Sequence, residues 1–286
     1  MIYDVNGNAI TRFYDVNGAE KHQAYDVNGN PLITPSTDFR IMTYNVGSWY
    51  TGTTSRVPSD KKTQYYNLQY GTFDNNPADV VLLQEYLSTW CVDDSPASEL
   101  ISPFYSYIQT TRPTTVYQGH AICANSPISN YTVHPFTSHG GNYPSFESGE
   151  VVIGGKTVTF VNTHNDYNMT YQSPEITDLL NFISNLSSFV LAGDFNINLS
   201  TQDTTDPQYY NNVTRFLDAG YHVGNCDFAW IETYFSTSSP TGGKFTDTII
   251  TSADITIRNL YAYTEKLTDN LGDKIDHIPL IAELSI

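Results

Sequence analysis

Positive charge is scarce in this 286-residue sequence. It contains 13 Lys and Arg residues against 30 Asp and Glu residues, which gives a formal net charge of −17. This balance excludes a broad basic face, and with it tight non-specific binding to a nucleic-acid backbone, which depends on neutralising phosphates. It does not exclude an enzyme that contacts a phosphodiester through a divalent cation, because a bound cation supplies its own local positive field.

Cysteine is also rare, with residues only at Cys91, Cys123 and Cys226. No two of them have the spacing of metal ligands, and an odd number argues against a disulfide scaffold. We therefore expect buried or half-buried thiols.

Long hydrophobic runs are missing as well. No stretch approaches about 18 consecutive apolar residues, so we expect no transmembrane helix. The first residues, MIYDVNGNAI, lack the basic and apolar regions of a signal peptide. The compartment stays open between the cytoplasm and release by a route other than Sec.

The residues that are abundant indicate a folded protein. Apolar residues make up 40% of the chain and aromatic residues 14%, with 22 Tyr, while charged residues reach only 15%. Such a composition argues against general disorder. The length suits one large α/β domain with an appendage.

The appendage carries a repeat. The motif YDVNG occurs at 3–7, 14–18 and 25–29, a period of 11 residues. Asn-Gly favours a tight β-hairpin turn, and a lone hairpin is marginally stable in water. An oligomerisation or attachment module, a loosely ordered tail and a Ca²⁺ loop are all open interpretations. The Ca²⁺ interpretation is the weakest, because Ala9 stands where an EF-hand loop needs glycine. The two prolines of 31–38 predict a linker, so we expect an appendage over 1–37 and a catalytic domain over 38–286.

Beyond the linker, strand-like runs alternate with helical patterns. Helices are predicted at 61–71, 173–187 and 207–220; in the second, Ser173 fits the N-cap and Pro174 the first helical position. The third ends at Gly220. Apolar and β-branched runs predict strands at 39–46, 78–86, 119–128, 149–164, 188–195, 245–263 and 276–286. The run 149–164 is predicted as a hairpin around Gly154 and Gly155. The pattern predicts a sheet-rich, layered α/β domain.

Polar side chains stand where these runs end. In VLAGDFNINLS, residues 190–200, an apolar strand leads to Asp194 and Asn196. Residues i and i+2 of a strand point to the same side, so we expect these two to face one point. Similar positions are held by Asn45, Glu85, His164, Asp247, Asp276 and His277. One carboxylate at a strand end means little, but the whole set predicts a common cleft.

These residue types suit one reaction. Carboxylate and carboxamide oxygens bind a hard cation such as Mg²⁺, which polarises a phosphoryl oxygen and stabilises the leaving oxygen. Histidines accept a proton or donate hydrogen bonds to the phosphate. No Ser or Cys stands in a nucleophile's setting, so water is the expected attacker.

Residues 39–286 resemble the endonuclease/exonuclease/phosphatase superfamily. The matching stretches come in the family's order: RIMTYNV, DVVLLQE, GHAICANSPI, VTFVNTH, LAGDFNI, FTDTIIT and DHIPLIAEL. The resemblance implies two packed mixed β-sheets flanked by helices, a four-layer α/β sandwich, with the N-terminal hairpin repeat outside it.

The resemblance also implies roles around a cation and a water molecule. Glu85 is the implied main ligand of Mg²⁺ or Mn²⁺, with Asn45 beside it and Asp276 nearby. Asp194 is implied to orient or deprotonate the attacking water. Asn196 holds the neighbourhood of Asp194 and donates to the phosphate as charge grows in the transition state.

Two histidines are implied to face the phosphate. His277 is held by a hydrogen bond to Asp247, which sets its tautomer and favours its charged form. His164 is the second, and its presence favours the deoxyribonuclease, sphingomyelinase and 5-phosphatase branches over apurinic endonucleases.

Some positions depart from the family pattern. His120 stands where many relatives have a small or amide residue. It is either a core histidine or a substrate contact. His139 lies in a Gly- and aromatic-rich loop, either lining the cleft or as plain loop. Arg112 and Lys244 are the nearest candidates for a phosphate contact, and each is otherwise an ordinary surface charge.

We therefore expect a metal-dependent phosphoester hydrolase that uses direct attack by water. Nucleic acid, a phospholipid headgroup and a phosphorylated small molecule all remain as substrates. The alternative is a binding or attachment protein with a vestigial hydrolase domain, assembled as a homo-oligomer through residues 1–37. The intact polar set argues against this alternative, because a decayed site should have lost some of its costly buried groups.

Overall fold

The computed structural model describes nine stretches of the chain and four short N-terminal strands. The stretches are 37–46, 62–86, 101–111, 119–140, 144–197, 205–224, 231–233, 245–263 and 277–286. Near the N-terminus, β1 (Ile2–Tyr3) pairs with β2 (Ala9–Ile10), and β3 (Phe13–Tyr14) pairs with β4 (Glu20–Lys21). The third repeat, 25–29, lies outside the described residues, and the boundary at residue 37 stays a prediction.

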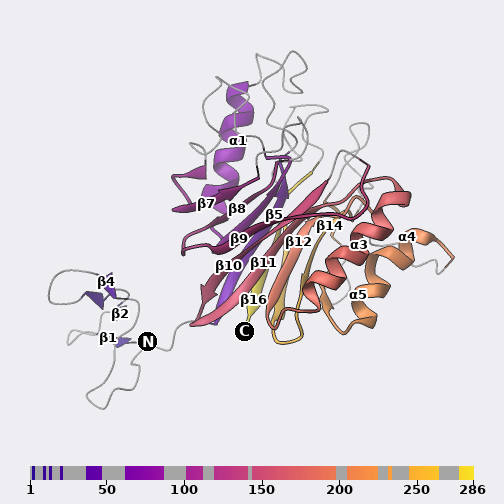
Figure 1. Cartoon of the computed structure of the whole chain (residues 1–286). Coiled ribbons are helices and arrows are strands. Elements are labelled where there is room, and N and C mark those ends of the chain that lie inside the picture. Colours follow the sequence, from indigo (N-terminus) through magenta and orange to yellow (C-terminus); the bar gives the residue numbers. More distant parts are fainter. Residues whose placement is uncertain are drawn as a thin grey trace.

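Two six-stranded mixed sheets form the body of the protein (Figure 1). The first sheet has the order β15 (Thr256–Ala262), β16 (Leu280–Ser285), β5 (Asp38–Asn45), β6 (Val80–Gln84), β8 (Ala121–Ala124) and β7 (Tyr107–Thr110). The second has the order β13 (His222–Val223), β14 (Asp247–Thr251), β12 (Phe189–Asp194), β11 (Lys156–His164), β10 (Ser145–Ile153) and β9 (Ser129–Pro135). Each contains one parallel pair among the described strands, β5 with β6 and β11 with β12.

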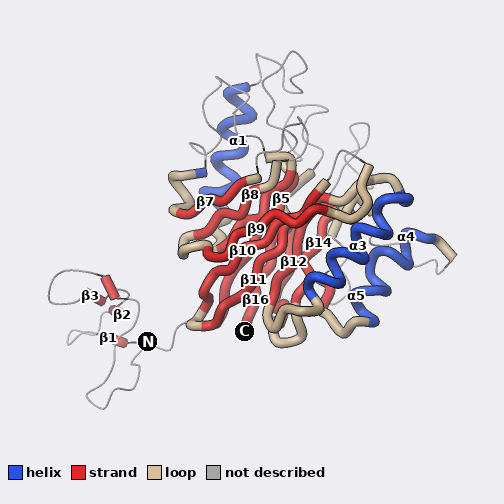
Figure 2. Tube along the Cα trace, in the orientation of Figure 1, coloured by secondary structure: helices blue, strands red, loops and turns tan. Residues whose placement is uncertain are grey.

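Helices cover the outer faces of the two sheets (Figure 2). Helix α1 (Lys62–Asn75) packs through Phe73 on the first sheet, in a cluster with Met42, Val81 and Leu83. Helix α3 (Met169–Ile183) packs on the second sheet. Beside it lies a helical stretch made of α4 (Pro207–Tyr209), the π-helical segment η2 (Tyr210–Thr214) and α5 (Arg215–Asp218). The layers run helix, sheet, sheet, helix, which confirms the expected sandwich.

Strand residues alternate between the outer clusters and a core between the sheets, as a period of two requires. On β12, Phe189 and Leu191 face the helices, whereas Val190 and Ala192 face the opposite sheet. The inter-sheet core also contains Phe39, Ile41, Leu82, Val158 and Phe160. These inward faces lead along each strand toward the polar residues at the strand ends.

The start of α3 differs from the sequence prediction. The helix begins at Met169, with the Asn168 side chain accepting a hydrogen bond from the Thr170 backbone N–H, so Pro174 lies inside it. The Ser173-Pro174 signal correctly predicted a helix but misplaced its start, because an earlier cap adds a turn of helix that contacts the site.

Other strands and helices differ in extent. The expected strand over 245–263 is divided into β14 and β15, and the last strand begins at Leu280. The sequence prediction missed β9, whose residues are mostly exposed and so lack an apolar run. Gly220 does end the helical stretch, with a left-handed φ of 82°. None of the helices within the described residues combines the length and apolar character needed to cross a bilayer.

Candidate active site

The strand ends bring the predicted residues to one edge of the sandwich. In the second sheet, His164 ends β11 beside Asp194 at the end of β12, and Asp194 pairs with Asp247 at the start of β14. In the first sheet, Asn45 ends β5 beside Gln84, the residue before Glu85. Since their inward faces meet, side chains from both sheets converge.

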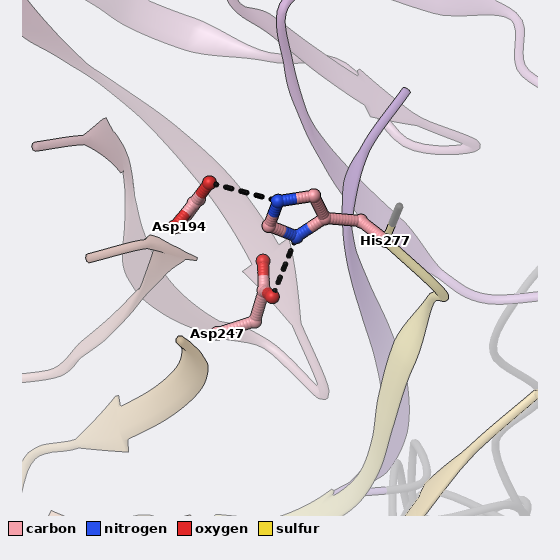
Figure 3. A group of neighbouring side chains, drawn as sticks. All are labelled: Asp194, Asp247 and His277. Atoms are coloured by element: carbon pink, nitrogen blue, oxygen red, sulfur yellow. Dashed lines mark hydrogen bonds and ion pairs between the residues drawn. The ribbon is translucent and has the colours of Figure 1, made fainter. Parts of the chain in front are cut away.

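His277 joins two carboxylates at the centre of this convergence (Figure 3). Its Nδ1 lies 2.9 Å from Asp247 Oδ2, which is the hydrogen bond that the family resemblance implies. Its Nε2 lies 3.4 Å from Asp194 Oδ2. All three side chains are buried, and their ligand-type atoms lie within 4.8 Å of one another. An acceptor at Nδ1 orients the ring so that Nε2 faces Asp194.

Asp194 collects further contacts from both sheets. Asn45 Nδ2 donates to Asp194 Oδ2 at 3.0 Å and lies 3.4 Å from Glu85 Oε1. His164 Nε2 lies 3.3 Å from the same Asp194 oxygen. The Asp194 carboxylate is therefore the junction of the site, with Glu85, which is partly exposed, at its outer side.

The environment pushes the pKa values of the two aspartates in opposite directions. Burial raises the pKa of Asp194, but His277, His164 and the hydrogen bonds from His164 and Asn45 outweigh it and hold that pKa well below its usual range. Burial, helped by the charge of Asp194, raises the pKa of Asp247 despite the opposing effect of His277. Such a divergence assigns different protonation roles to neighbouring carboxylates.

His164 is under two opposing influences. Burial lowers its pKa, but Asp194, its hydrogen bond and the charge of Glu85 raise it above the usual value. Asn196 Nδ2 lies 2.9 Å from His164 Nε2 and also donates to the Asn165 carbonyl at 2.8 Å, which fixes the amide's orientation. Nε2 therefore accepts from Asn196 when unprotonated and donates to Asp194 when protonated.

Asn196 reaches the site in a way that the sequence argument did not foresee. The strand ends at Asp194, and Asn196 has a left-handed φ of 51°, so the two residues do not share a strand face. Instead, the Asn196 backbone N–H donates to Asp194 Oδ1 at 2.8 Å. Gly193, the residue before Asp194, lets β12 lie close to β11, because a Cβ there would lie 1.9 Å from the Thr163 carbonyl oxygen. The convergence was expected, but its physical reason is a tight turn.

The backbone at Glu85 is also locally distorted, and this distortion directs the Glu85 side chain. In the part of the chain that the structure describes, only Glu85, Asn130 and Asn196 have positive φ without being glycine. Leu83 pairs with Ala121, whereas the Tyr86 N–H donates to the Gly119 carbonyl, so the β6 side holds one extra residue. This is a β-bulge, a device that re-aims a side chain next to a site.

Polar residues of helix α3 support the site, and the sequence prediction missed them. Gln172 Nε2 donates to the Asn196 carbonyl at 2.9 Å. Glu175 Oε2 accepts from Asn165 Nδ2 at 3.1 Å and from the Asp166 N–H at 2.8 Å, and burial raises the pKa of Glu175 to about 7. Both are buried beside Ile176. A polar residue on the apolar face of a helix was the available signal.

The remaining candidates divide into buried, exposed and undescribed residues. His120 is 1% exposed, and burial together with nearby His164 lowers its pKa to about 3, which matches a core histidine. His139 is exposed. Cys123 is a buried free thiol, as expected. Outside the described residues lie Asp276, Arg112, Lys244, Cys91 and Cys226.

The fold and the site together define a two-sheet α/β sandwich with a histidine–carboxylate cluster at its strand ends. A protein-family profile described as the Endonuclease/Exonuclease/phosphatase family matches residues 42–269. The chain therefore belongs to this family, and its fold is that of phosphoesterases and nucleases. A search among curated proteins gave no match.

Solved structures agree on the fold. A humanized D. rerio TDP2 carrying 14 mutations is 12% identical, with a TM-score of 0.65 and coverage of 88% of this chain and 100% of the other. A family member from Bacteroides thetaiotaomicron is 14% identical, with a TM-score of 0.64 and coverage of 88% and 98%. A variant of the 3′ phosphatase NExo from Neisseria, bound to a product DNA hairpin, is 18% identical, with a TM-score of 0.59 and coverage of 87% and 100%.

Proposed function

We propose that the chain is a metal-dependent phosphoester hydrolase in which an activated water molecule attacks phosphorus directly. The observation that carries the proposal is the Asp194 carboxylate, buried at the junction of both sheets and contacted by Asn45, His164 and His277. Four buried polar groups aimed at one point are expensive to desolvate. Perturbed titratable groups that converge in this way mark a catalytic site.

In this proposal each residue of the candidate active site has a role. Asp194 orients the attacking water; its low pKa makes it a better hydrogen-bond acceptor than proton acceptor. His277 presents Nε2 to the phosphate, with Asp247 fixing its ring. Asn196 Nδ2 and His164 Nε2, which lie 2.9 Å from each other, would exchange this contact for the phosphoryl oxygens of a bound substrate, where donors stabilise growing charge.

The donor set at the outer side of the site fits a hard cation. Glu85 carries a carboxylate, and Asn45, whose Nδ2 lies 3.4 Å from Glu85 Oε1, carries an amide oxygen. Both oxygen types are ligands that Mg²⁺ accepts alongside retained waters. Asp276 remains a proposed third contributor. A bound Mg²⁺ or Mn²⁺ supplies Lewis-acid polarisation of a phosphoryl oxygen and stabilisation of the leaving oxygen.

Hydrolysis of bis(p-nitrophenyl) phosphate tests the reaction class. We expect turnover with Mg²⁺ or Mn²⁺, loss of turnover in EDTA, and no turnover in Asp194→Ala. Turnover by the wild type no faster than by Asp194→Ala would favour the binding interpretation. A panel of plasmid DNA, RNA, sphingomyelin and inositol phosphates then selects among nucleic acid, phospholipid headgroup and phosphorylated small molecule. The likeness to a 3′ phosphatase that binds DNA makes DNA the first member to assay.

The second candidate is an attachment protein assembled through residues 1–37, and the YDVNG repeat favours it. Size-exclusion chromatography of the whole chain and of a variant without residues 1–37 tests the assembly. A drop from an oligomeric to a monomeric elution volume supports it, and a change no larger than the lost mass contradicts it.

A further inference from the structure

A layer of buried polar side chains lies between the apolar inter-sheet core and the candidate active site. On β5 the inward residues run Phe39, Ile41, Thr43 and Asn45, and on β11 they run Val158, Phe160, Asn162 and His164. Gln84 on β6 and Glu147 on β10 occupy the same level. Thr43, Gln84, Asn162 and Glu147 are all 0% exposed. None of the four belongs to the site's own contacts.

Asn162 is the hub of this layer. Its Nδ2 lies within hydrogen-bond distance of the Leu83 carbonyl at 2.9 Å, the Ala121 carbonyl at 3.1 Å and Glu147 Oε1 at 3.0 Å. Its Oδ1 accepts from Gln84 Nε2 at 2.7 Å. One side chain of the second sheet is thus bonded to two neighbouring strands of the first, β6 and β8.

The other members extend the connection across the layer. Gln84 Nε2 also lies 3.1 Å from Thr43 Oγ1 on β5. On the second sheet, the Tyr131 hydroxyl donates to Glu147 Oε2 at 2.6 Å. Burial raises the pKa of Glu147 to about 8, against the effect of these hydrogen bonds.

The position of this layer matters because the site is divided between the sheets. Asn45 and Glu85 come from the first sheet, whereas His164 and Asp194 come from the second. Gln84 directly precedes Glu85, and Asn162 precedes His164 by two residues on the same strand face. Apolar packing below the layer is non-directional, but hydrogen bonds have preferred lengths and angles.

We propose that Asn162 is a positioning residue of the active site: its hydrogen bonds to β6 and β8 fix the spacing of the two sheets directly beneath Glu85 and His164. The inference rests on the proposed function for its catalytic consequence. Its structural consequence, the placement of Asn45 and Glu85 of the first sheet against Asp194 and His164 of the second, is independent of activity.

Asn162→Leu removes the hub at nearly constant volume, and Thr251→Val is the matched control. Thr251 is also fully buried on the second sheet and donates through Oγ1 to the Ile255 carbonyl at 2.7 Å, but it lies at the opposite end of β14 from Asp247. In Asn162→Leu we expect kcat for bis(p-nitrophenyl) phosphate to fall about tenfold to a hundredfold, because small misplacements of reacting groups lower the rate by about this much. KM should stay within about threefold, and Thr251→Val should keep kcat within about twofold.

A second readout separates failure of this inference from failure of the proposed function. The imidazole ¹⁵N chemical shifts of His164, measured at one pH without added metal, should move in Asn162→Leu and not in Thr251→Val. If the wild type proves inactive, these shifts alone decide the inference. Unchanged shifts, or a kcat within twofold of wild type in folded Asn162→Leu, would overturn it.

A milder variant covers the case in which Asn162→Leu does not fold. Gln84→Met removes the hydrogen bonds to Asn162 and Thr43 but leaves Asn162 in place. We expect a smaller effect of the same kind, about a threefold fall in kcat with KM held and a displaced His164 signal. A Gln84→Met protein with neither change would equally overturn the proposal.

Discussion

The two ends of the same pair of sheets carry charge in opposite ways. At one end, where β5, β6, β11 and β12 finish, Asp194, Asp247, His164 and His277 are buried and contact one another. At the other end, about 20 Å away along β5, the charges lie at the surface. Arg40 pairs with Glu283 at 2.9 Å and Arg258 with Asp38 at 3.5 Å, with side chains between 35% and 60% exposed.

Under the proposed function, this difference separates charges that serve solubility from charges that serve chemistry. Exposed ion pairs contribute about 0–1 kcal/mol to stability and are screened by salt. Buried charges are costly to desolvate and are retained where a specific arrangement compensates for them. The strand ends near Asp194 therefore carry a stability penalty that the opposite end avoids. The predictions below test this contrast, beginning with catalysis and metal binding and ending with the smallest effect on stability.

Removing His277 should have the largest effect. Acid–base groups contribute about 10²–10⁴-fold to rate, so we expect His277→Ala to lower kcat on bis(p-nitrophenyl) phosphate by at least about 1000-fold with the fold intact by circular dichroism. His134→Ala is the control, since that ring stacks on Phe146 on the second sheet. Near-normal rates in His277→Ala would contradict the assignment of a phosphate-facing histidine.

Neutralising Glu85 should weaken the response to metal. Glu85→Gln keeps the side chain's shape and removes its charge, so the Mg²⁺ or Mn²⁺ concentration for half-maximal activity should rise about tenfold or more, which corresponds to about 1.4 kcal/mol. Calorimetric titration with Mn²⁺ gives the same comparison without substrate. The control is Glu283→Gln at the opposite end, which should leave metal affinity unchanged. Equal affinities in the two variants would exclude Glu85 as a ligand.

The sequence was informative where a strand's inward face turns from apolar to polar. On β11, the alternation continues from Phe160 to His164, and on β12 it reaches Asp194, so the position of each side chain followed from periodicity alone. Asn196 was different, because its place depends on a left-handed turn and on Gln172 from α3. No local pattern records a contact between residues 24 apart.

The buried polar layer shows a second limit of the sequence. Asn162 and Glu147 stand within runs that were correctly predicted as strands or lie beside them. Periodicity places Asn162 on the same strand face as Phe160 and His164. It does not say which groups of the opposite sheet Asn162 meets, and the structure shows these to be the Leu83 and Ala121 carbonyls and the Gln84 side chain. Those partners depend on how the two sheets pack, so the sequence could not identify them.

Glu147 should make stability depend on pH. The pKa of Glu147 is about 8 in the folded protein, well above the ordinary value of about 4.3 for glutamate in an unfolded chain. Between these values the folded state binds more protons than the unfolded state, so stability falls as pH rises, by up to roughly 1.4 kcal/mol per pH unit. Glu147→Gln imitates the protonated form and should remove this loss. Thermal melts from pH 5 to pH 9 measure it, and parallel Tm curves for variant and wild type would refute it.

Removing an exposed ion pair should have the smallest effect. Arg258 lies 3.5 Å from Asp38, with side chains 59% and 60% exposed, and its Nη2 also donates to Ser285 Oγ at 2.9 Å. Arg258→Ala should change the free energy of unfolding by no more than about 1 kcal/mol, measured by urea denaturation, and should leave kcat unchanged. The effect should shrink further in 1 M salt, because screening reaches about 3 Å there. A loss of activity in Arg258→Ala would mean that the two ends are coupled through β5 and β16, and that the contrast between surface charge and site charge does not hold.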